Sequence, residues 1–357
     1  MAVTLEQVAQ RAGVSRGAAS FVLRDHPKAR TFSEATVARV RAAADELGYR
    51  PNFFQTRRNR AQLLMCYVAS LQDLYAASIV ESFQNHAAQR GYWVTVHAGR
   101  DESGEQLFDQ RIIGQHGIAA VALIGGICGR VSRRQVEDLV DAGVRVVVVG
   151  RHLPARGVSH VLSDNRVGGR LIGEHLRELG VSRVAMLAER DKADRSRRDR
   201  ERGLVDAVEA TPGMKLERVL NASRGREAAT PEAIDAAGYQ AVRARLAARR
   251  RPPQAVVTQA DLRAMGAYRA IGEAGLRPGL DIAVVGYTDI WPAGMLYPTL
   301  TTVHEPTEEM GRSAAGVLID QLEGHAATPR TVELQPTLKV RDSTAAWAPS
   351  SPEQADG

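Results

Sequence analysis

The sequence is poor in cysteine and in long apolar runs, and both shortages narrow the class of protein. Its 357 residues include two cysteines, Cys66 and Cys128, too few and too far apart for a disulfide framework or a metal site. No apolar run reaches the roughly 18 residues of a membrane-spanning helix, and the first twenty residues lack the apolar segment of a signal peptide. These absences predict a cytoplasmic protein with no metal, no cofactor and no membrane contact.

Motifs that carry catalysis are also lacking. The glycine-rich stretch at 125–129 has no Lys-Ser/Thr pair to complete a phosphate-binding loop. The nine histidines are scattered without metal-ligand spacing, and the sequence has no nucleophile elbow or catalytic pair of carboxylates. The sequence therefore predicts that the chain is not an enzyme.

Positive charge is concentrated near the N-terminus. The net charge is +6; residues 1–60 hold 11 Lys and Arg against 5 Asp and Glu, whereas the rest of the chain holds 36 of each. Because the whole excess lies in the first sixty residues, this segment alone is expected to bind a polyanion.

The segment 4–24 has the pattern of a helix-turn-helix. Apolar and small residues recur at helical spacing, and the pattern breaks once, at Gly13, which predicts two short helices joined by a turn. Thr4 and Gln7 have the spacing of a capping box, and Ser15 can cap the second helix. An unrelated helical hairpin is the alternative. The second helix would present to a major groove Arg16, Gly17, Ser20, Phe21 and Arg24.

A third helix is expected to begin after Ser33, so that three helices form a small domain over residues 1–50. Its expected core consists of Val8, Val22, Val37 and Leu47. Pro51 ends the domain, and residues 51–62 form a basic hinge. The hinge is either a disordered tether or a segment that folds into a helix only on DNA.

From residue 63 the chain alternates apolar strand-like runs with amphipathic helical segments. Strands are expected at 63–69, 92–98, 119–125 and 144–150, and then at 157–164, 183–189, 214–220, 255–260 and 282–287. Buried parallel strands joined by helices form doubly wound sheets. Two α/β lobes are therefore expected, with a ligand site in the cleft where the carboxyl ends of their strands meet.

Five stretches resemble, in order, the lactose-repressor (LacI/GalR-type) family of bacterial transcription regulators: VTLEQVAQRAGVS, VARVRAAADELGYRPN, SDNRVGGRLIGEHLRELG, DIAVVGYTD and LTTVHEPTEEMGRSA. The match covers residues 3–342. The resemblance implies an α/β protein in which a three-helix helix-turn-helix domain precedes two doubly wound lobes of the periplasmic-binding-protein type. We expect the first lobe at 63–163 and 291–323, the second at 164–290 and 324–342, and a disordered tail at 343–357.

The resemblance also assigns DNA contacts residue by residue. Hydroxyl groups would lie near backbone phosphates at Thr4, Ser15, Ser20, Ser33 and Thr36. Arg16 is placed to pair with guanine, a contact worth about 1–3 kcal/mol of discrimination. The other positions assigned to DNA are Gly17, Phe21, Arg24, Tyr49, Asn52, Phe54, Arg57 and Arg58.

Two of these positions depart from the family pattern. Phe21 stands where the family usually has arginine, and it either contacts thymine methyl groups or packs inward. Arg58 stands where the family inserts a leucine into the minor groove, and a charged side chain cannot act as an apolar wedge. Arg57 and Arg58 are instead expected to hold phosphates or a narrow minor groove, with Phe54 as a substitute wedge or a dimer contact.

Effector-binding residues follow from the same resemblance: Tyr75, Asp164, Ser196, Arg200, Asp261 and Thr288. Three polar positions of sugar-binding members are replaced by Gly150, Ala260 and Thr288, so a typical hexose is a poor fit, because each unmade buried hydrogen bond costs about 1–3 kcal/mol. Arg200 favours an anionic effector, unless it is one more solvated charge. The two aspartates serve equally well to orient the backbone.

Together these features predict a sequence-specific DNA-binding transcriptional regulator, a repressor, that binds a pseudo-palindromic operator as a homodimer. A small-molecule effector in the cleft would change its DNA affinity. The alternatives are a solute-binding protein with the same lobes and an α/β enzyme with a basic N-terminal extension. The missing signal peptide and the N-terminal charge oppose the first alternative, and the missing catalytic motifs oppose the second.

Overall fold

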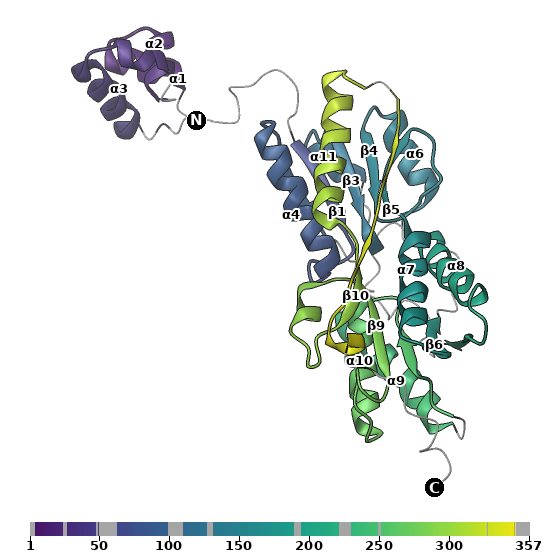
Figure 1. Cartoon of the computed structure of the whole chain (residues 1–357). Coiled ribbons are helices and arrows are strands. Elements are labelled where there is room, and N and C mark those ends of the chain that lie inside the picture. Colours follow the sequence, from purple (N-terminus) through teal and green to yellow (C-terminus); the bar gives the residue numbers. More distant parts are fainter. Residues whose placement is uncertain are drawn as a thin grey trace. The chain divides into compact units, whose positions relative to one another are not determined.

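The structure, a computed structural model, describes residues 4–23, 27–47, 49, 63–98, 110–126, 131–188, 194–220, 230–248, 251–326, 328–345 and 347. The chain divides into two units, Met1–Arg60 and Ala61–Gly357, and each is described by itself (Figure 1). In the described ranges no helix has both the length and the apolar character needed to cross a membrane.

Three α-helices form the first unit, and local sequence sets where they begin. α1 (Leu5–Ala12) starts at the expected capping box, in which the Thr4 hydroxyl accepts from the Gln7 N–H and the Gln7 side chain accepts from the Thr4 N–H. Gly13 ends α1 at a φ of 65°, a left-handed conformation that favours glycine. The elements that follow are α2 (Arg16–Leu23), the 3-10 helix η1 (Pro27–Thr31) and α3 (Glu34–Glu46).

The core of the first unit is made of small and β-branched residues. Val8 and Val22 are fully buried, as expected, whereas Val37 and Leu47 are half-buried and pack against the cluster. Alanines of all three helices fill the space between them. Small side chains let three short helices approach closely, which fixes the orientation of α2.

Two six-stranded sheets form the second unit (Figure 1). The first sheet has the order β11-β5-β4-β3-β1-β2, and all its neighbouring strands are parallel. β3 is buried along its whole length, as the continuous apolar run predicts. The strands of this sheet are β1 (Leu63–Val68), β2 (Trp93–His97), β3 (Ala120–Ile124), β4 (Arg145–Val149), β5 (Val158–Ser163) and β11 (Thr331–Leu334).

The second sheet has the order β12-β10-β9-β8-β6-β7. Its neighbours are parallel except β10 and β12, which are antiparallel. Its strands are β6 (Arg183–Ala188), β7 (Lys215–Leu220), β8 (Ala255–Val257), β9 (Ala283–Thr288), β10 (Thr301–His304) and β12 (Thr337–Lys339).

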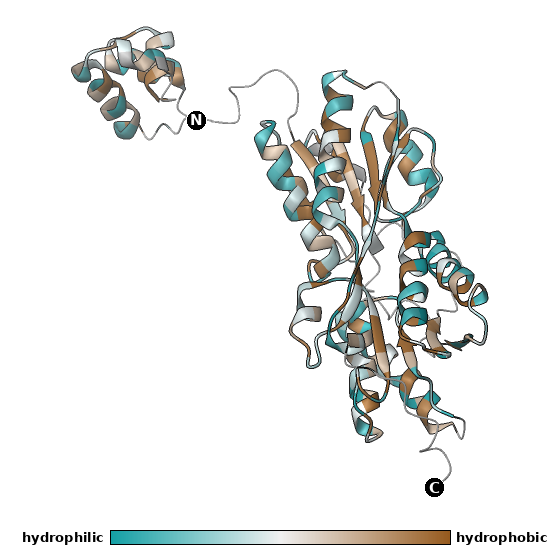
Figure 2. Cartoon of the chain, in the orientation of Figure 1, coloured by the Kyte–Doolittle hydropathy of each residue, from teal (hydrophilic) through white to brown (hydrophobic). Residues whose placement is uncertain are grey.

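Helices cover both faces of each sheet. On the first sheet, α4 and α11 pack side by side on one face and α5 and α6 on the other (Figure 1). On the second, α7 and α8 cover one face and α9 and α10 the other. Figure 2 shows apolar strands between helices whose outer faces are polar. These helices are α4 (Leu74–Gln89), α5 (Gln110–Gln115), α6 (Arg133–Asp141), α7 (Asn165–Glu178), α8 (Arg195–Glu209), α9 (Pro231–Ala247), α10 (Asp261–Glu273) and α11 (Thr307–Glu323).

The chain crosses between the lobes three times, after β5, after β10 and after β11. The expected assignment of 291–323 to the first lobe is wrong for β10, which pairs with β9 in the second sheet. The assignment of 324–342 to the second lobe is wrong for β11, which pairs with β5 in the first. Four-residue strands of this composition suit either sheet, so the distant pairing partner decides their place.

The expected disordered tail at 343–357 is wrong for its first residues. Ser343 and Thr344 are buried in the short helix α12 (Asp342–Ala345). The Ser343 hydroxyl donates to the Val284 carbonyl at 2.6 Å and accepts from the Thr301 N–H at 2.8 Å. Trp347 is 6% exposed within the core of the second lobe. Hydrogen bonds to strand backbone, which composition does not reveal, hold this segment; the remainder of the tail lies outside the described residues.

Candidate functional site

α2 carries the side chains assigned to base reading. The Ser15 hydroxyl accepts from the Ala18 N–H at 3.1 Å and caps the helix. The alanine and valine face of α2 is buried, which leaves Arg16 with 71% of its side chain exposed and its Nε 3.8 Å from the Glu6 carboxylate. Gly17 is also exposed. An exposed guanidinium in the first turn of such a helix can reach a base edge.

Phe21 is half-buried, as is Ser20 beside it. The Lys28 ammonium lies 5.7 Å from the centre of the Phe21 ring, within the range of a cation–π contact. The ring is therefore neither fully packed inward nor fully presented to solvent.

Of the hydroxyls assigned to phosphates, all but that of Ser20, which lies within α2, are at helix N-termini. Ser33 caps α3 by accepting from the Thr36 N–H at 3.3 Å, and the two hydroxyls are 3.0 Å apart. Thr4 holds the same place on α1. Unpaired N–H groups and the helix dipole make such ends favourable for phosphate. Tyr49 is half-buried against the helical core; Arg24, Asn52, Phe54, Arg57 and Arg58 lie outside the described residues.

A cavity of about 280 Å³ lies between the two lobes, at the carboxyl ends of their strands. The first lobe contributes the loops after β1, β3 and β4 together with the start of α4. The second contributes the first turns of α8 and α10 and the end of β9. The structure brings five of the six residues assigned to the effector into its lining: Tyr75, Ser196, Arg200, Asp261 and Thr288.

Asp164 does not line this cavity. Its carboxylate accepts from the Val167 N–H at 3.0 Å and caps α7, and it borders a neighbouring hollow with His152 and Arg195. Asp164 was expected either to contact the effector or to orient the backbone, and this geometry favours the second role.

Tyr75 occupies space that another side chain would need. Asp73 caps α4 and places Tyr75 in its first turn. Gly150 has a φ of +78°, and a Cβ there would lie 2.6 Å from the Tyr75 hydroxyl, which itself donates to Met310 Sδ at 3.7 Å. The glycine that replaces a polar residue is thus matched by a tyrosine that fills the same part of the cleft.

Arg200 is 9% exposed and is held by the protein itself. Its Nε and Nη2 donate to the Asn165 side-chain oxygen at 3.1 and 2.7 Å, and its Nη1 donates to the Gln259 carbonyl at 2.5 Å. The guanidinium lies 3.2 Å from the centre of the Tyr287 ring. It is a buried, fixed cation and not one more solvated charge.

Close packing of α7 on α8 sets the position of Arg200. A Cβ at Gly169 would lie 1.9 Å from the Arg200 carbonyl oxygen, and a Cβ at Gly203 would lie 1.9 Å from the Arg166 carbonyl oxygen. Glycine alone permits this approach of the two backbones.

Asp194 joins the lobes. Its carboxylate contacts Arg151 Nη1, from the loop after β4, at 2.8 Å and Arg197 Nε, from α8, at 3.2 Å. It also caps α8 through the Ser196 N–H at 3.0 Å. The Ser196 hydroxyl donates to the Gly150 carbonyl in the opposite lobe at 3.4 Å. These contacts hold the two lobes together around the cavity.

Three arginines, Arg151, Arg197 and Arg200, line the cavity beside four acidic residues. Burial lowers the pKa of Arg197 well below its usual value, and the guanidinium groups of Arg151, Arg263 and Arg200 add to this effect. The Arg151 and Arg197 side chains both contact the carboxylate of Asp194. Repulsion among the guanidinium groups favours an incoming anion, because the charge of the anion would relieve that repulsion.

Asp261 is completely buried and is used within the second lobe. It accepts from the Thr302 hydroxyl at 2.6 Å, the Ile290 N–H at 2.9 Å and the Thr288 hydroxyl at 3.3 Å. Burial raises its pKa to about 7. Asp261 therefore orients the turn after β9, where Thr288 and Asp289 have φ values of 108° and 58°. Of its two expected roles, orienting the backbone and contacting the effector, this is the first.

Six charged or polar residues that line the cavity were not predicted from the sequence: Asp73, Arg151, Asp194, Arg197, Gln259 and Glu305. For Arg197 a signal exists, because Asp194, Arg197 and Arg200 are spaced by three and share one helix face. No sequence pattern predicts a cavity position for Glu305. It lies in an acidic stretch that is typical of the exposed start of a helix.

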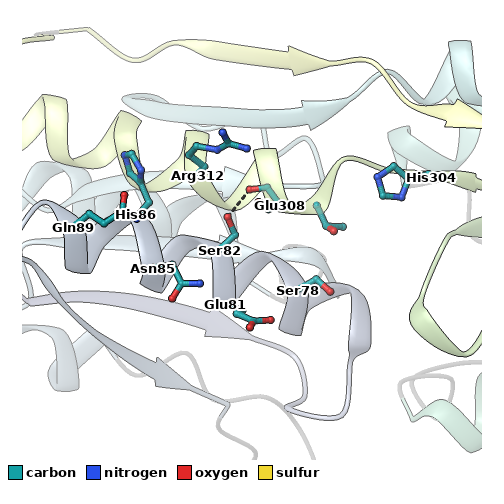
Figure 3. Close-up of a pocket in the computed structure, with 10 residues that line it drawn as sticks. Ser78, Glu81, Ser82, Asn85, His86, Gln89, His304, Glu308 and Arg312 are labelled. Atoms are coloured by element: carbon teal, nitrogen blue, oxygen red, sulfur yellow. Dashed lines mark hydrogen bonds between the residues drawn. The ribbon is translucent and has the colours of Figure 1, made fainter.

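A second, larger hollow of about 700 Å³ lies on the outside of the first lobe, between α4 and α11. Figure 3 shows its polar lining, with Ser82 donating to the Glu308 carbonyl. It contains His86, Arg312 and His304 together with Glu81. Its residues were not assigned a role from sequence.

Comparison with known proteins matches both units. The model for bacterial regulatory proteins of the lacI family matches residues 4–52, and the periplasmic binding protein-like domain matches residues 174–344. The transcriptional repressor PurR of Pectobacterium carotovorum is 29% identical over 350 residues, covering 96% of this chain and 97% of that protein. PurR of Yersinia pestis is 28% identical over 347 residues, with the same coverage.

Solved structures agree with this assignment. The regulator CelR in complex with cellobiose is 29% identical, has a TM-score of 0.64 and matches over 96% of this chain and 99% of that one. The Lac repressor dimer bound to operator and the anti-inducer ONPF has the same fold, with a TM-score of 0.72, 24% identity and the same coverage. With its helix-turn-helix, its two lobes and these matches along nearly its whole length, the chain belongs to the LacI family of bacterial regulatory proteins.

Proposed function

We propose that this chain is a cytoplasmic transcriptional repressor that binds a pseudo-palindromic operator as a homodimer and responds to a small anionic effector. The observation that carries the proposal is the union in one chain of a capped recognition helix with an exposed Arg16 and a two-lobed cavity rich in buried arginine. The proposal includes no catalytic step, no cofactor and no membrane contact.

On the DNA side, each half-site takes one α2 in its major groove, with half-sites about one helical turn apart. Arg16 reads a guanine, and the exposed half of Phe21 contacts a thymine methyl group. Phosphates are held by the hydroxyls of Thr4, Ser15, Ser20, Ser33 and Thr36. The residues proposed to support DNA binding from the following segments are Arg24, Tyr49, Asn52, Phe54, Arg57 and Arg58.

On the effector side, the acid group of the ligand binds Arg151 and Arg197, whose guanidinium groups both contact Asp194. Arg200 is not the primary contact for the acid group, because three of its N–H groups already donate to Asn165 and Gln259. It positions the residues around it. A typical hexose remains a poor fit, because Gly150, Ala260 and Thr288 supply no set of paired donors and acceptors.

Coupling between the two activities follows from the contacts across the cleft. An acid that binds Arg151 and Arg197 competes with Asp194, the residue that joins the lobes. The ligand thereby changes lobe closure and with it the spacing of the two hinges in the dimer. By linkage, operator DNA and effector change each other's affinity by the same factor.

A gel-shift comparison tests the proposed function. The full chain and a protein lacking residues 1–60 are titrated onto duplexes selected by the full chain from a random pool, at two salt concentrations. The full chain is expected to bind a palindromic subset, with affinity that falls steeply as salt increases. Equal affinity of the truncated protein would remove DNA binding from the N-terminal unit.

A further inference from the structure

Glu305 is a buried carboxylate that lines the interlobe cavity. It follows β10, at the crossing into α11, and is 3% exposed. Among the described residues, no N–H or O–H donates to its side chain. Its ion-pair partner is Arg200, whose Nη2 lies 3.8 Å from Glu305 Oε2, beyond hydrogen-bond distance.

The cations around Glu305 are engaged elsewhere. Arg200 Nη2 donates to Asn165 at 2.7 Å, and Arg151 and Arg197 both contact Asp194. Burial raises the pKa of Glu305, and the nearby charge of Asp194 adds to the increase. A buried carboxylate without donors is costly to a folded protein, and proteins keep such costs where function requires them.

Gln259 adds a second unsatisfied acceptor to the same cavity. It is 5% exposed, and its side-chain oxygen is without a hydrogen-bond partner in the described part of the chain. Arg200 donates to the Gln259 carbonyl through Nη1 and faces Glu305 through Nη2. Gln259 and Glu305 therefore both contact the Arg200 guanidinium group, Gln259 through its backbone carbonyl and Glu305 through its carboxylate.

We propose that the effector is a small zwitterion, whose basic nitrogen donates to Glu305 while its acid group binds Arg151 and Arg197. The inference rests on the proposed function, because it takes the cleft as the effector site. Amino acids and other small amines that carry a carboxylate or phosphate have this chemistry. Plain acids supply no donor to Glu305, and plain amines supply no anion to Arg151 and Arg197 besides Asp194.

In this arrangement Glu305 is the residue that determines specificity for aminated acids. A nitrogen donor satisfies a group that the protein leaves unpaired, so an analogue without the nitrogen is rejected by more than the loss of one contact. The acid group alone does not distinguish among anions, because Arg151 and Arg197 bind carboxylate and phosphate alike.

Isothermal titration calorimetry of the full chain with matched compounds tests the inference. Three sets are used, each as zwitterion, acid and amine: 4-aminobutyrate, butyrate and butylamine; 4-(aminomethyl)benzoate, benzoate and benzylamine; 2-aminoethyl phosphate, ethyl phosphate and ethylamine. At least one zwitterion is expected to bind about tenfold or more tightly than its acid and its amine. Glu305→Gln is expected to lower the affinity for that zwitterion about tenfold, and to leave the affinity for the acid unchanged.

Glu309→Gln is the matched control, since Glu309 is an exposed residue of α11 that lies outside the cavity lining, and it should bind like the parent protein. The melting temperature of Glu305→Gln should equal or exceed that of the parent, because a buried charge whose ion pair with Arg200 spans 3.8 Å is replaced by a neutral amide. The inference is overturned when no zwitterion exceeds its acid, when none of the nine compounds binds, or when Glu305→Gln leaves zwitterion binding intact. Operator binding is measured on the same samples without compound. A sample that binds operator but no zwitterion contradicts this inference alone, whereas a sample that does not bind operator contradicts the proposed function.

Discussion

Arg16 and Arg200 are both arginines, but one is exposed and the other is buried, and this difference decides what each side chain can do. Arg16 has 71% of its side chain exposed and one loose ion pair, so its donors are available to a partner molecule. Arg200 has 10% of its side chain exposed, and it donates hydrogen bonds to Asn165 and Gln259. The exposed arginine suits recognition, whereas the buried one fixes the geometry around it.

Arg16→Ala should relax the base preference at one position in each half-site. A bidentate contact to guanine is worth about 1–3 kcal/mol, so the preferred base at that position should lose most of its advantage in a competition assay with single-base variants of the operator. Arg39→Ala, an exposed change on α3, is the comparison and should not alter base preference. A uniform loss across all sequences for Arg16→Ala would make Arg16 a phosphate contact.

At the scale of single elements, the contact of α7 with α8 supports the cleft. Gly169 and Gly203 bring the two backbones together, and this contact places Arg200 beneath the cavity. Any side chain at either position must push the helices apart and displace Arg200 from Asn165. The element pair therefore couples fold stability to the position of Arg200 in the cavity lining.

Gly169→Ala is expected to destabilise the second unit by several kcal/mol, because its Cβ would lie 1.9 Å from the Arg200 carbonyl oxygen and overpacking of this kind costs about 1–3 kcal/mol or more. Gly272→Ala in α10 meets no atom within 4 Å and should be neutral or stabilising by about 0.5–1 kcal/mol. Urea unfolding of both variants measures the difference. Equal midpoints would show that α7 and α8 can separate without cost.

How far each element could be predicted depends on how local its determinants are. The beginnings of α1, α2 and α3 were predicted because Thr4, Ser15 and Ser33 act within one helical turn. The sheets to which β10 and β11 belong were not, since partners far along the chain decide them. Glu305 was missed for the same reason, as its cavity exists only after both lobes have formed.

At the scale of the whole second unit, Asp194 and Ser196 tie the lobes across the cleft. Each of these contacts is individually modest, since partly exposed ion pairs contribute about 0–1 kcal/mol. A balance between open and closed arrangements that rests on such contacts can be moved by a small ligand.

Arg151→Met should shift this balance toward open lobes by about 1 kcal/mol, or about fivefold. The distance between one spin label on α6 and one on α9 measures it in the absence of compound, with Cys128 replaced by serine. Cys66 stays unlabelled because it is buried, which raises the pKa of its thiol. Arg133→Met breaks a pair with Glu137 inside α6 and serves as the control; identical distances for both variants would remove Arg151 from lobe closure.

The three crossings between the lobes also order events during synthesis. The first lobe lacks its edge strand β11 until residue 334 has left the ribosome, whereas the helices of the first unit end at Glu46. Domains fold as their sequence is completed, so the DNA-binding helices form long before the sensor that controls them. Until β11 arrives, β5 offers an open edge that can pair wrongly. The nascent chain thus has folded DNA-binding helices before its second unit is complete, and a first sheet in which β5 is still unpaired along one edge. Both conditions end when β11 has been synthesised.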